Sequence, residues 1–257
     1  MIKRFNRFEL KYVVPSSTRD AIIDELGAHV TPDPEGGPRG IYAVTSLYYD
    51  SPDLSCFRAK LDGIRYRRKL RIRRYGDVAD SSPRVMVEIK QRIGRTIQKR
   101  RLAARLHDAY RLCAGGREMR WRDPGDAAVA GEVEFLVRSL LLQPTCVIGY
   151  TRQSFMGMRY EPGLRITLDQ CLWSSVPSGG LLGEARRHAF LPPNLFIMEV
   201  KANNAVPLWV AHLLARHRCS LSRYSKYCAG LVRLRELGQS PSAGVEMPTE
   251  PAGPPLH

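Results

Sequence analysis

Several segments of the chain alternate between apolar and charged side chains. The clearest is residues 63–76, GIRYRRKLRIRRYG, which holds seven cations in fourteen residues. Its odd positions from 65 to 73 are all basic, whereas its even positions are mostly apolar. A period of two places alternate side chains on opposite faces of a strand. The segment therefore predicts a strand with one cationic and one hydrophobic face, and we expect Ile64, Tyr66, Leu70 and Ile72 to pack beneath helices.

The same reasoning predicts the other elements of the chain. Strands are expected at residues 5–15, 42–51, 84–92, 145–155, 164–173 and 194–203. Helices are expected at residues 16–30, 52–61 (a short helix or a turn), 101–116, 127–142, 207–217 and 222–237. Strands with helices inserted between them predict one α+β domain over residues 1–237. Residues 238–257 are rich in Pro, Gly and Ser, which predicts a disordered tail.

The polar faces of the predicted strands hold acids and bases two positions apart, as at Glu9 and Lys11 or at Glu199 and Lys201. Such faces can simply be exposed to solvent, as in an ordinary sandwich of sheets. Alternatively, they line the inside of a barrel while the apolar faces point outward beneath helices. The excess of cations on several strands favours the second arrangement. Its buried charges must then be paired or bound to ions.

Composition supports a polyanionic partner. The 257 residues carry a formal net charge of +15, which favours nucleic acid, an anionic membrane or phosphate-rich small molecules. The six cysteines form no CxxC pair, which argues against a zinc site or a disulfide framework and favours a reducing, cytoplasmic location. The N-terminus has no apolar core of a signal peptide, and we expect no transmembrane segment because no run of eighteen apolar residues occurs.

Eight short motifs occur in the order found in a known family. They are RFELKY, KLRIRRYG, VEIKQR, IQKRR, YTRQSF, RITLD, MEVKAN and RYSKY, within a match from about Arg4 to Leu231. With them the chain resembles the VTC (vacuolar transporter chaperone) domain, a polyphosphate polymerase of the triphosphate tunnel metalloenzyme superfamily that is related to CYTH hydrolases and cyclases. The resemblance implies an α+β fold in which an antiparallel eight-stranded β-barrel forms a tunnel with a charged interior and helices packed on the outside.

The resemblance also implies which side chains hold phosphate and metal. Nine cations and one hydroxyl are expected to bind phosphate, in large part within one enclosed tunnel: Lys11, Arg71, Arg73, Lys90, Lys99, Arg152, Arg165, Lys201, Ser225 and Lys226. Five of them are expected to act in catalysis: Arg71, Arg73, Lys90, Arg152 and Lys226. The expected ligands of a divalent metal are Glu199, with Glu9 and Glu88 as helpers, and Asp169 as a further candidate.

The implied function is the metal-dependent transfer of the ATP γ-phosphate to a growing inorganic polyphosphate chain, with Mn or Mg as cofactor. Phosphoryl transfer depends on positioning and electrostatic stabilisation, so it needs no Ser-His-Asp arrangement. Hydrolase relatives begin with an acid–x–acid–x–Lys pattern, whereas this chain has Arg7, Glu9 and Lys11 at those positions. Arginine in place of the first acid should weaken binding of a second metal and strengthen phosphate binding, which favours the polymerase.

Three other functions compete with this interpretation. A tunnel-fold hydrolase of tripolyphosphate or a nucleoside triphosphate would share the basic lining and the metal. A nucleic-acid binder could stack bases on Tyr66 and Tyr75, but carboxylates beside the cations would repel a nucleic-acid backbone, so we expect no nucleic-acid partner. A polyphosphate-binding regulator with a degenerate site is disfavoured by Glu199 and Lys226. The expected partners are ATP and inorganic polyphosphate, while the sequence assigns no membrane-associated partner.

Overall fold

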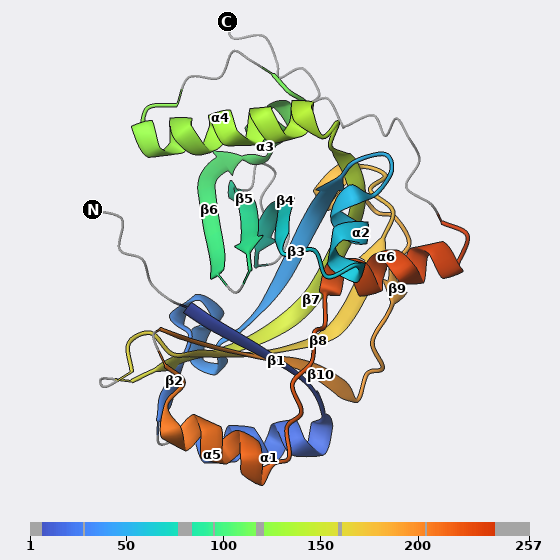
Figure 1. The fold of residues 1–257 in the computed structure, drawn as a ribbon. Helices are drawn as coiled ribbons and strands as arrows, with labels where there is room; N and C mark the ends of the chain where they lie inside the picture. The colour runs from blue at the N-terminus through green and yellow to red at the C-terminus, as the bar shows by residue number, and fades with distance from the viewer. Residues whose placement is uncertain are drawn as a thin grey trace, which may run out of the picture. The chain divides into compact units, whose positions relative to one another are not determined.

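The computed structural model describes residues 7–27, 29–76, 84–94, 96–116, 121–158, 161–203 and 205–239, and it shows an α+β protein (Figure 1). Its strands are β1 (Arg7–Pro15), β2 (Val30–Pro32), β3 (Ile41–Asp50), β4 (Tyr66–Tyr75), β5 (Arg84–Ile93), β6 (Thr96–Arg105), β7 (Gln143–Gly157), β8 (Arg165–Ser175), β9 (His188–Ala189) and β10 (Leu195–Asn203). Its α-helices are α1 (Ser16–Leu26), α2 (Ser55–Leu61), α3 (Leu106–Cys113), α4 (Pro124–Ser139), α5 (Leu208–Arg216) and α6 (Lys226–Glu236). None of these helices is both long enough and apolar enough to cross a bilayer. The tail predicted for residues 238–257 lies outside the described residues from residue 240 onward.

Eight of the described strands follow one hydrogen-bonded order, β1-β10-β8-β7-β3-β4-β5-β6, while β2 pairs with β7 and β9 with β8. Neighbours in this order are antiparallel at β1–β10, β10–β8, β4–β5 and β5–β6. The α+β class and the antiparallel sheet expected from the sequence are thereby confirmed. The closure of the strands around one tunnel stays a prediction.

The chain divides into two compact units, each made of three separate segments. Unit 1 comprises Met1–Val44, Gly149–Trp173 and Ala189–Ala229, and unit 2 comprises Thr45–Ile148, Ser174–His188 and Gly230–His257. Strands β3, β7, β8 and β9 and helix α6 contribute residues to both units. The site residues of each unit are therefore described separately.

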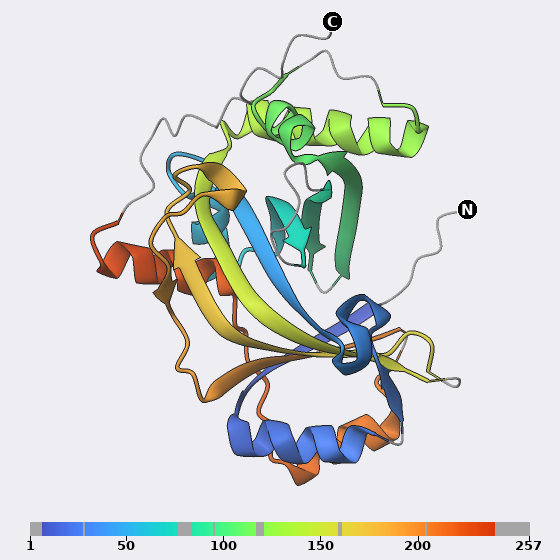
Figure 2. The same cartoon turned by 180° about the vertical axis from the view of Figure 1, so that it is seen from behind.

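In unit 1, helices cover the apolar face of the sheet. The cross-strand register aligns Leu10 of β1 with Val200 of β10 and Ile166 of β8. These residues pack in one core with Ile22 of α1 and Val210 of α5. Figures 1 and 2 show α1 and α5 side by side along β1 and β10. The charged residues of the same strands consequently occupy the face away from these two helices.

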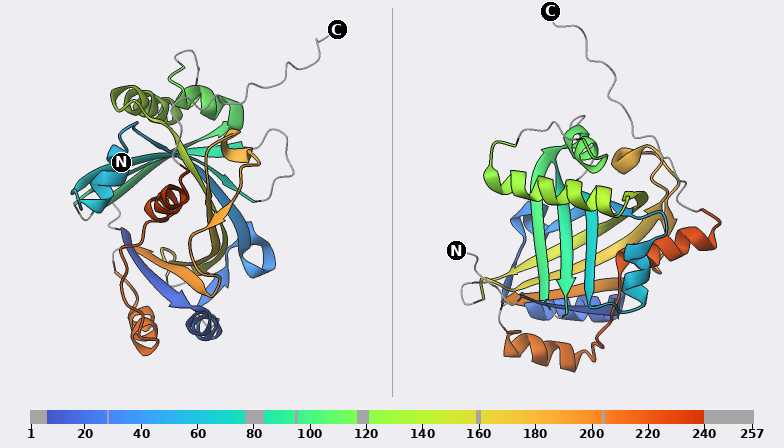
Figure 3. Two further views of the ribbon diagram at one scale, coloured as in Figure 1. Left: turned by 90° about the vertical axis from the view of Figure 1, so that its right-hand side faces the viewer. Right: turned by 45° about the horizontal axis from the view of Figure 1, so that its top comes forward.

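In unit 2, strands β4, β5 and β6 are covered in the same way. Leu70 pairs with Ile89, and Ile72 lies in register with Val87 and Leu102, all of them buried. Helices α3 and α4 pack on β5 and β6, and α2 packs on β4 (Figure 3, right). The prediction that Leu70 and Ile72 form a covered apolar face is confirmed, as is the placement of helices on the apolar faces.

Two sequence predictions in this region are wrong. Residues 101–105 belong to β6, although their composition predicts a helix from residue 101, and α3 begins only at Leu106. Strand β6 pairs with β5 over its whole length, and this long-range pairing overrides the helix propensity of the Arg-Leu-Ala run. Ile64 and Tyr66 are 49% and 45% exposed rather than packed beneath helices. They lie at or before the start of β4, whereas the buried apolar residues Leu70 and Ile72 lie further along it.

Candidate functional site

The charged residues predicted for unit 1 gather on one face of β1, β10 and β8. Lys11 lies opposite Glu199, and Glu9 lies opposite Lys201, which in turn is paired with Arg165. Cross-strand partners point to the same side of a sheet. The charged side chains that lie two positions apart on each strand therefore form a single charged surface.

Glu199 is the centre of this surface. Its Oε1 atom lies 2.8 Å from Nζ of Lys226 and 3.2 Å from Nζ of Lys11, and its Oε2 atom lies 2.6 Å from Nζ of Lys201. Lys11 also contacts Glu9 at 3.2 Å. Three ammonium groups from β1, β10 and the first residue of α6 therefore converge on one buried carboxylate.

A second carboxylate, Asp169 of β8, holds Arg152 of β7. Arg152 donates through Nε and Nη2 to the two oxygens of Asp169, at 2.7 and 2.8 Å, and through Nη2 to the hydroxyl of Tyr150 at 3.3 Å. Lys226 links the two carboxylates, because its Nζ also lies 2.6 Å from Oδ2 of Asp169. The bidentate contact fixes the orientation of the guanidinium group.

The ion pairs decide the charge states in unit 1. Burial alone would raise the pKa of Glu199, but Lys11, Lys201 and Lys226 outweigh it and hold that pKa well below the usual value. Burial would likewise raise the pKa of Asp169, and the charges of Arg152 and Lys226 lower it instead. Both carboxylates are therefore ionised at neutral pH.

The pKa of Lys201 is shifted differently from that of Lys226, which also contacts Glu199. Burial lowers the pKa of Lys201 to about 8, because the charge of Glu199 only partly compensates and Arg152 adds repulsion. Lys226 is also buried, yet Asp169 and Glu199 together raise its pKa above the ordinary value. An additional anion at this face would restore the proton to Lys201 at moderately alkaline pH.

One hydroxyl on this face is buried without a partner. Thr167 lies opposite Glu199 on β8 and is fully buried, and within the described part of the chain its Oγ1 atom has no hydrogen-bond partner. A water molecule or a ligand oxygen would satisfy it.

Arg165 is turned toward a separate set of groups. It donates through Nη2 to Asp33 at 2.6 Å and to the hydroxyl of Tyr42 at 2.7 Å, and through Nε to Ser154 at 3.0 Å. Although Arg165 shares a strand face with the residues around Glu199, its guanidinium group is held by Asp33, a residue that sequence reasoning does not single out.

In unit 2, Arg71 and Glu88 repeat the arrangement of Arg152 and Asp169. Arg71 donates through Nε and Nη2 to Oε2 of Glu88, at 2.8 and 2.6 Å, and through Nη1 to the hydroxyl of Tyr48 at 3.0 Å. Lys99 forms an ion pair with the other oxygen of the same carboxylate. Each unit therefore holds an arginine that is clamped by a buried carboxylate and a tyrosine, with a lysine on that carboxylate.

The register of β4, β5 and β6 adds a row of lysines beside this cluster. Lys69 lies opposite Lys90, which lies opposite Lys99. Like charges directly opposite each other on neighbouring strands destabilise a sheet unless an anion lies among them. Arg73 is buried nearby on β4 and donates to the hydroxyl of Ser46 at 3.0 Å.

The cations near Tyr48 change the pKa of its phenol. Burial raises the pKa of its phenol, but Arg71, Arg73 and Lys69 outweigh burial and lower the pKa to about 8. Arg71, Arg73 and Lys99 hold the pKa of Glu88 far below its usual range despite burial.

Sequence reasoning missed the tyrosines of both clusters. Tyr150 precedes Arg152 by two residues and Tyr48 follows Ser46 by two, so strand alternation could have placed each on a charged face. Ser225, a predicted phosphate ligand, precedes α6, and its Oγ accepts a hydrogen bond from the backbone N–H of Cys228 at 3.4 Å.

The predicted metal ligands lie against lysine and arginine side chains. Glu9, Glu88 and Glu199 each contact ammonium or guanidinium groups, and both oxygens of Glu199 are engaged. Within the described residues, no three His, Cys, Asp or Glu side chains are grouped so that they could hold a metal ion. The carboxylates here serve as counterions for lysine and arginine.

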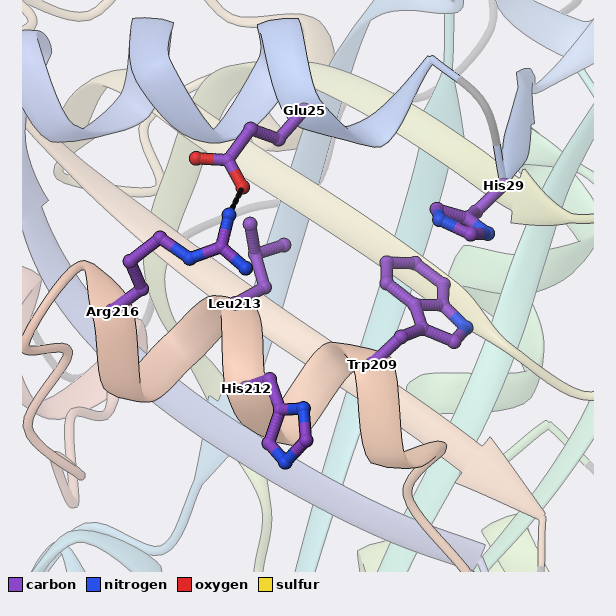
Figure 4. A pocket seen from close by; sticks show the side chains of 6 residues that line it. All are labelled: Glu25, His29, Trp209, His212, Leu213 and Arg216. Atoms are coloured by element: carbon purple, nitrogen blue, oxygen red, sulfur yellow. Dashed lines mark hydrogen bonds and ion pairs between the residues drawn. The ribbon is translucent and has the colours of Figure 1, made fainter.

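A surface hollow of about 210 Å³ lies elsewhere in unit 1, beside α5 (Figure 4). His29 stacks on Trp209 with ring centroids 4.3 Å apart, and Arg216 pairs with Glu25 at 2.5 Å. None of the predicted site residues lines this hollow.

Comparison with known proteins places the chain in a family. The family model of the VTC domain matches residues 6–235, so the chain belongs to the VTC domain family. No curated protein matches it. The resemblance inferred from the eight motifs is thus confirmed.

Solved structures show distant similarity. A candidate adenylate cyclase from Bacillus halodurans is 15% identical with a TM-score of 0.48, over 84% of this chain and 92% of that chain. A candidate adenylate cyclase from Vibrio parahaemolyticus is 12% identical with a TM-score of 0.42, over 87% and 96%. The Schizosaccharomyces pombe Mediator head module contains a chain 13% identical with a TM-score of 0.37, over 84% and 96%. At these TM-scores the similarities carry no argument about function.

Proposed function

We propose that this chain is an ATP-dependent polyphosphate polymerase, which transfers the γ-phosphate of ATP to the end of an inorganic polyphosphate chain. Membership of the VTC domain family supports the proposal. The observation that carries it is the repeated clamp, Arg71 on Glu88 and Arg152 on Asp169, each with a lysine on the carboxylate and a tyrosine on the arginine. Orientated guanidinium and ammonium groups are the parts that phosphoryl transfer requires.

In the proposed reaction, a terminal oxygen of the polyphosphate acceptor attacks the γ-phosphorus of ATP. A new P–O bond forms, the bond from the γ-phosphorus to the β,γ-bridging oxygen breaks, and ADP leaves with that electron pair. The clamped cations hold phosphate oxygens and stabilise the charge that spreads over them in the transition state. Glu199, Asp169 and Glu88 keep the cations in place, and no side chain acts as a nucleophile.

We propose that a divalent ion, Mn or Mg, enters as part of the metal–ATP substrate. The clamped carboxylates support this view, because a resident ion would have to displace lysines from them. Phosphate oxygens are themselves good ligands for Mg²⁺. The assignment of Glu199, Glu9 and Glu88 as metal ligands stays a prediction, as does a cytoplasmic location.

Incubation of the full chain with ATP and manganese tests the proposal. The polymerase makes long-chain polyphosphate, visible on a urea gel and removed by an exopolyphosphatase. If only ADP and orthophosphate appear, the chain is a hydrolase of triphosphates. If ATP is not consumed in the presence of either Mn or Mg, the chain is not an ATP-dependent enzyme of this kind.

A further inference from the structure

Four exposed apolar side chains lie together at one end of unit 2, and we call them the hairpin-end patch: Leu61, Ile64, Tyr66 and Ile93. They are 62%, 49%, 45% and 47% exposed. Tyr66 of β4 and Ile93 of β5 are direct cross-strand partners. The backbone N–H of Ile64 bonds to the carbonyl of Ala59 at 3.0 Å, which holds the segment after α2 against the end of that helix. These contacts place the four side chains around the start of β4.

Cations occur in the same segment as the hairpin-end patch. Residues 60–68 contain Lys60, Arg65, Arg67 and Arg68 against a single acid, Asp62. The guanidinium carbon of Arg68 lies 4.9 Å from the centre of the Tyr66 ring. The β5–β6 turn lies beside them, because the N–H of Gly94 bonds to the carbonyl of Arg65 at 3.0 Å. Arg92, which is exposed, donates to the carbonyl of Gly94 at 2.8 Å.

The patch combines aliphatic tips, a tyrosine ring and cations. Arginines alternate with apolar residues at positions 64 to 67. The alternation suits the boundary of a lipid bilayer, where aliphatic tips enter the acyl region, a tyrosine ring lies at headgroup level and arginines reach lipid phosphates.

We propose that the hairpin-end patch docks the protein on an anionic lipid bilayer. The cations are attracted to the negative surface, and the apolar tips then add contact that salt does not screen. Binding is peripheral and reversible. This inference goes beyond the proposed polymerase function and does not depend on it, because Leu61, Ile64 and Arg65 take no part in the phosphate clusters.

Cosedimentation of the full chain with vesicles tests the proposal. Vesicles of phosphatidylcholine containing phosphatidylglycerol should carry the protein down at low salt, and vesicles of phosphatidylcholine alone should not. The double variant Leu61→Ser/Ile64→Ser should bind anionic vesicles at least about tenfold more weakly, because its apolar tips are lost. Leu141→Ser, which alters a 70% exposed leucine elsewhere in unit 2, should bind like the wild type.

Two matched charge-reversal variants distinguish binding through the patch from binding through the general positive charge of the protein. Arg65→Glu and Arg122→Glu change the net charge equally, and both residues are exposed. Arg65→Glu should weaken vesicle binding, while Arg122→Glu should not. Equal loss in both variants, binding by Leu61→Ser/Ile64→Ser at the wild-type level, or no binding to anionic vesicles would overturn the proposal. Capture of an acidic protein by the patch, without vesicle binding, would also overturn it.

Discussion

At the scale of residues, the carboxylates of the charged faces act as counterions. Glu199 receives three ammonium groups, and its pKa is depressed by them despite burial. A carboxylate with a folded pKa below its unfolded value stabilises the fold above its ordinary range, and that stability is lost as the pH falls through the folded pKa. The fold of unit 1 therefore depends on Glu199 at neutral pH even when no ligand is present.

We expect Glu199→Gln to lower the free energy of unfolding by about 3–5 kcal/mol, because a buried group of cations loses its partner. Tripolyphosphate should raise the melting temperature of this variant more than that of the wild type, since phosphate replaces the lost charge. Thermal melts with and without tripolyphosphate measure both effects. Glu25→Gln is the control, because the side chain of Glu25 also forms an ion pair but is 34% exposed. Equal melting temperatures for the two variants would contradict the counterion role.

Protonation should couple to phosphate binding near pH 8. The pKa of Lys201 and that of Tyr48 are both about 8, and a bound polyanion raises both. Tripolyphosphate affinity should therefore fall from pH 7 to pH 9, with proton uptake on binding at pH 8. Calorimetry in two buffers of different ionisation enthalpy measures the uptake. Lys201→Met should remove part of it, and Tyr48→Phe should remove a further part. Uptake that both variants leave unchanged would place the ligand elsewhere.

The contribution of Lys201 to the stability of the free protein should change with pH in the opposite direction to tripolyphosphate affinity. The pKa of Lys201 is about 8 in the folded chain, against an ordinary value of 10.5. Between these values the unfolded chain binds more protons, so the contribution of Lys201 to stability rises with pH. Ligand affinity and stability of the free protein thus change in opposite directions through this one group.

At the scale of elements, strand faces could be predicted from the sequence but side-chain partners could not. Alternation alone placed Arg71 and Leu70 on opposite faces of β4, as the structure shows. The clamp of Arg71 on Glu88 depends on the register of β4 and β5, which no local spacing fixes. The strand at residues 101–105 was missed for the same reason, because pairing with β5 decides its conformation.

Two neighbouring positions on β4 test this assignment of faces. Leu70→Ala should lower the free energy of unfolding by about 2–5 kcal/mol as a core truncation, while tripolyphosphate still raises the melting temperature of the folded variant. Arg71→Ala should abolish most of that ligand effect. It should also destabilise the free protein, because buried Glu88 loses the arginine that donates two hydrogen bonds to it. The loss of this buried ion pair outweighs the relief of repulsion among the neighbouring cations.

Thermal melts of both β4 variants provide the measurement. A strand with its faces reversed would give a mild effect for Leu70→Ala and an unchanged tripolyphosphate shift for Arg71→Ala. Leu221→Ala is a matched control for the apolar truncation, because that leucine is 69% exposed and should cost little.

At the scale of the whole molecule, the sequence supplied the family and the class of fold. The order of eight motifs is a property of the entire chain, and the family model confirms it over residues 6–235. The arginine–carboxylate contacts of the two clamps could not be predicted, because each joins residues 17 positions apart through strand pairing. The proposed activity rests on arginines that buried carboxylates hold in place.

The fate of the γ-phosphate tests that central claim most directly. The full chain is incubated with ATP, Mg²⁺ and a short polyphosphate acceptor, and the reaction is followed by phosphorus NMR. The account predicts that ADP increases in step with interior polyphosphate phosphorus while orthophosphate stays at background, and that Arg71→Ala or Arg152→Ala each stop the reaction. Orthophosphate that rises in step with ADP, or chain growth at the wild-type rate in either variant, would contradict it.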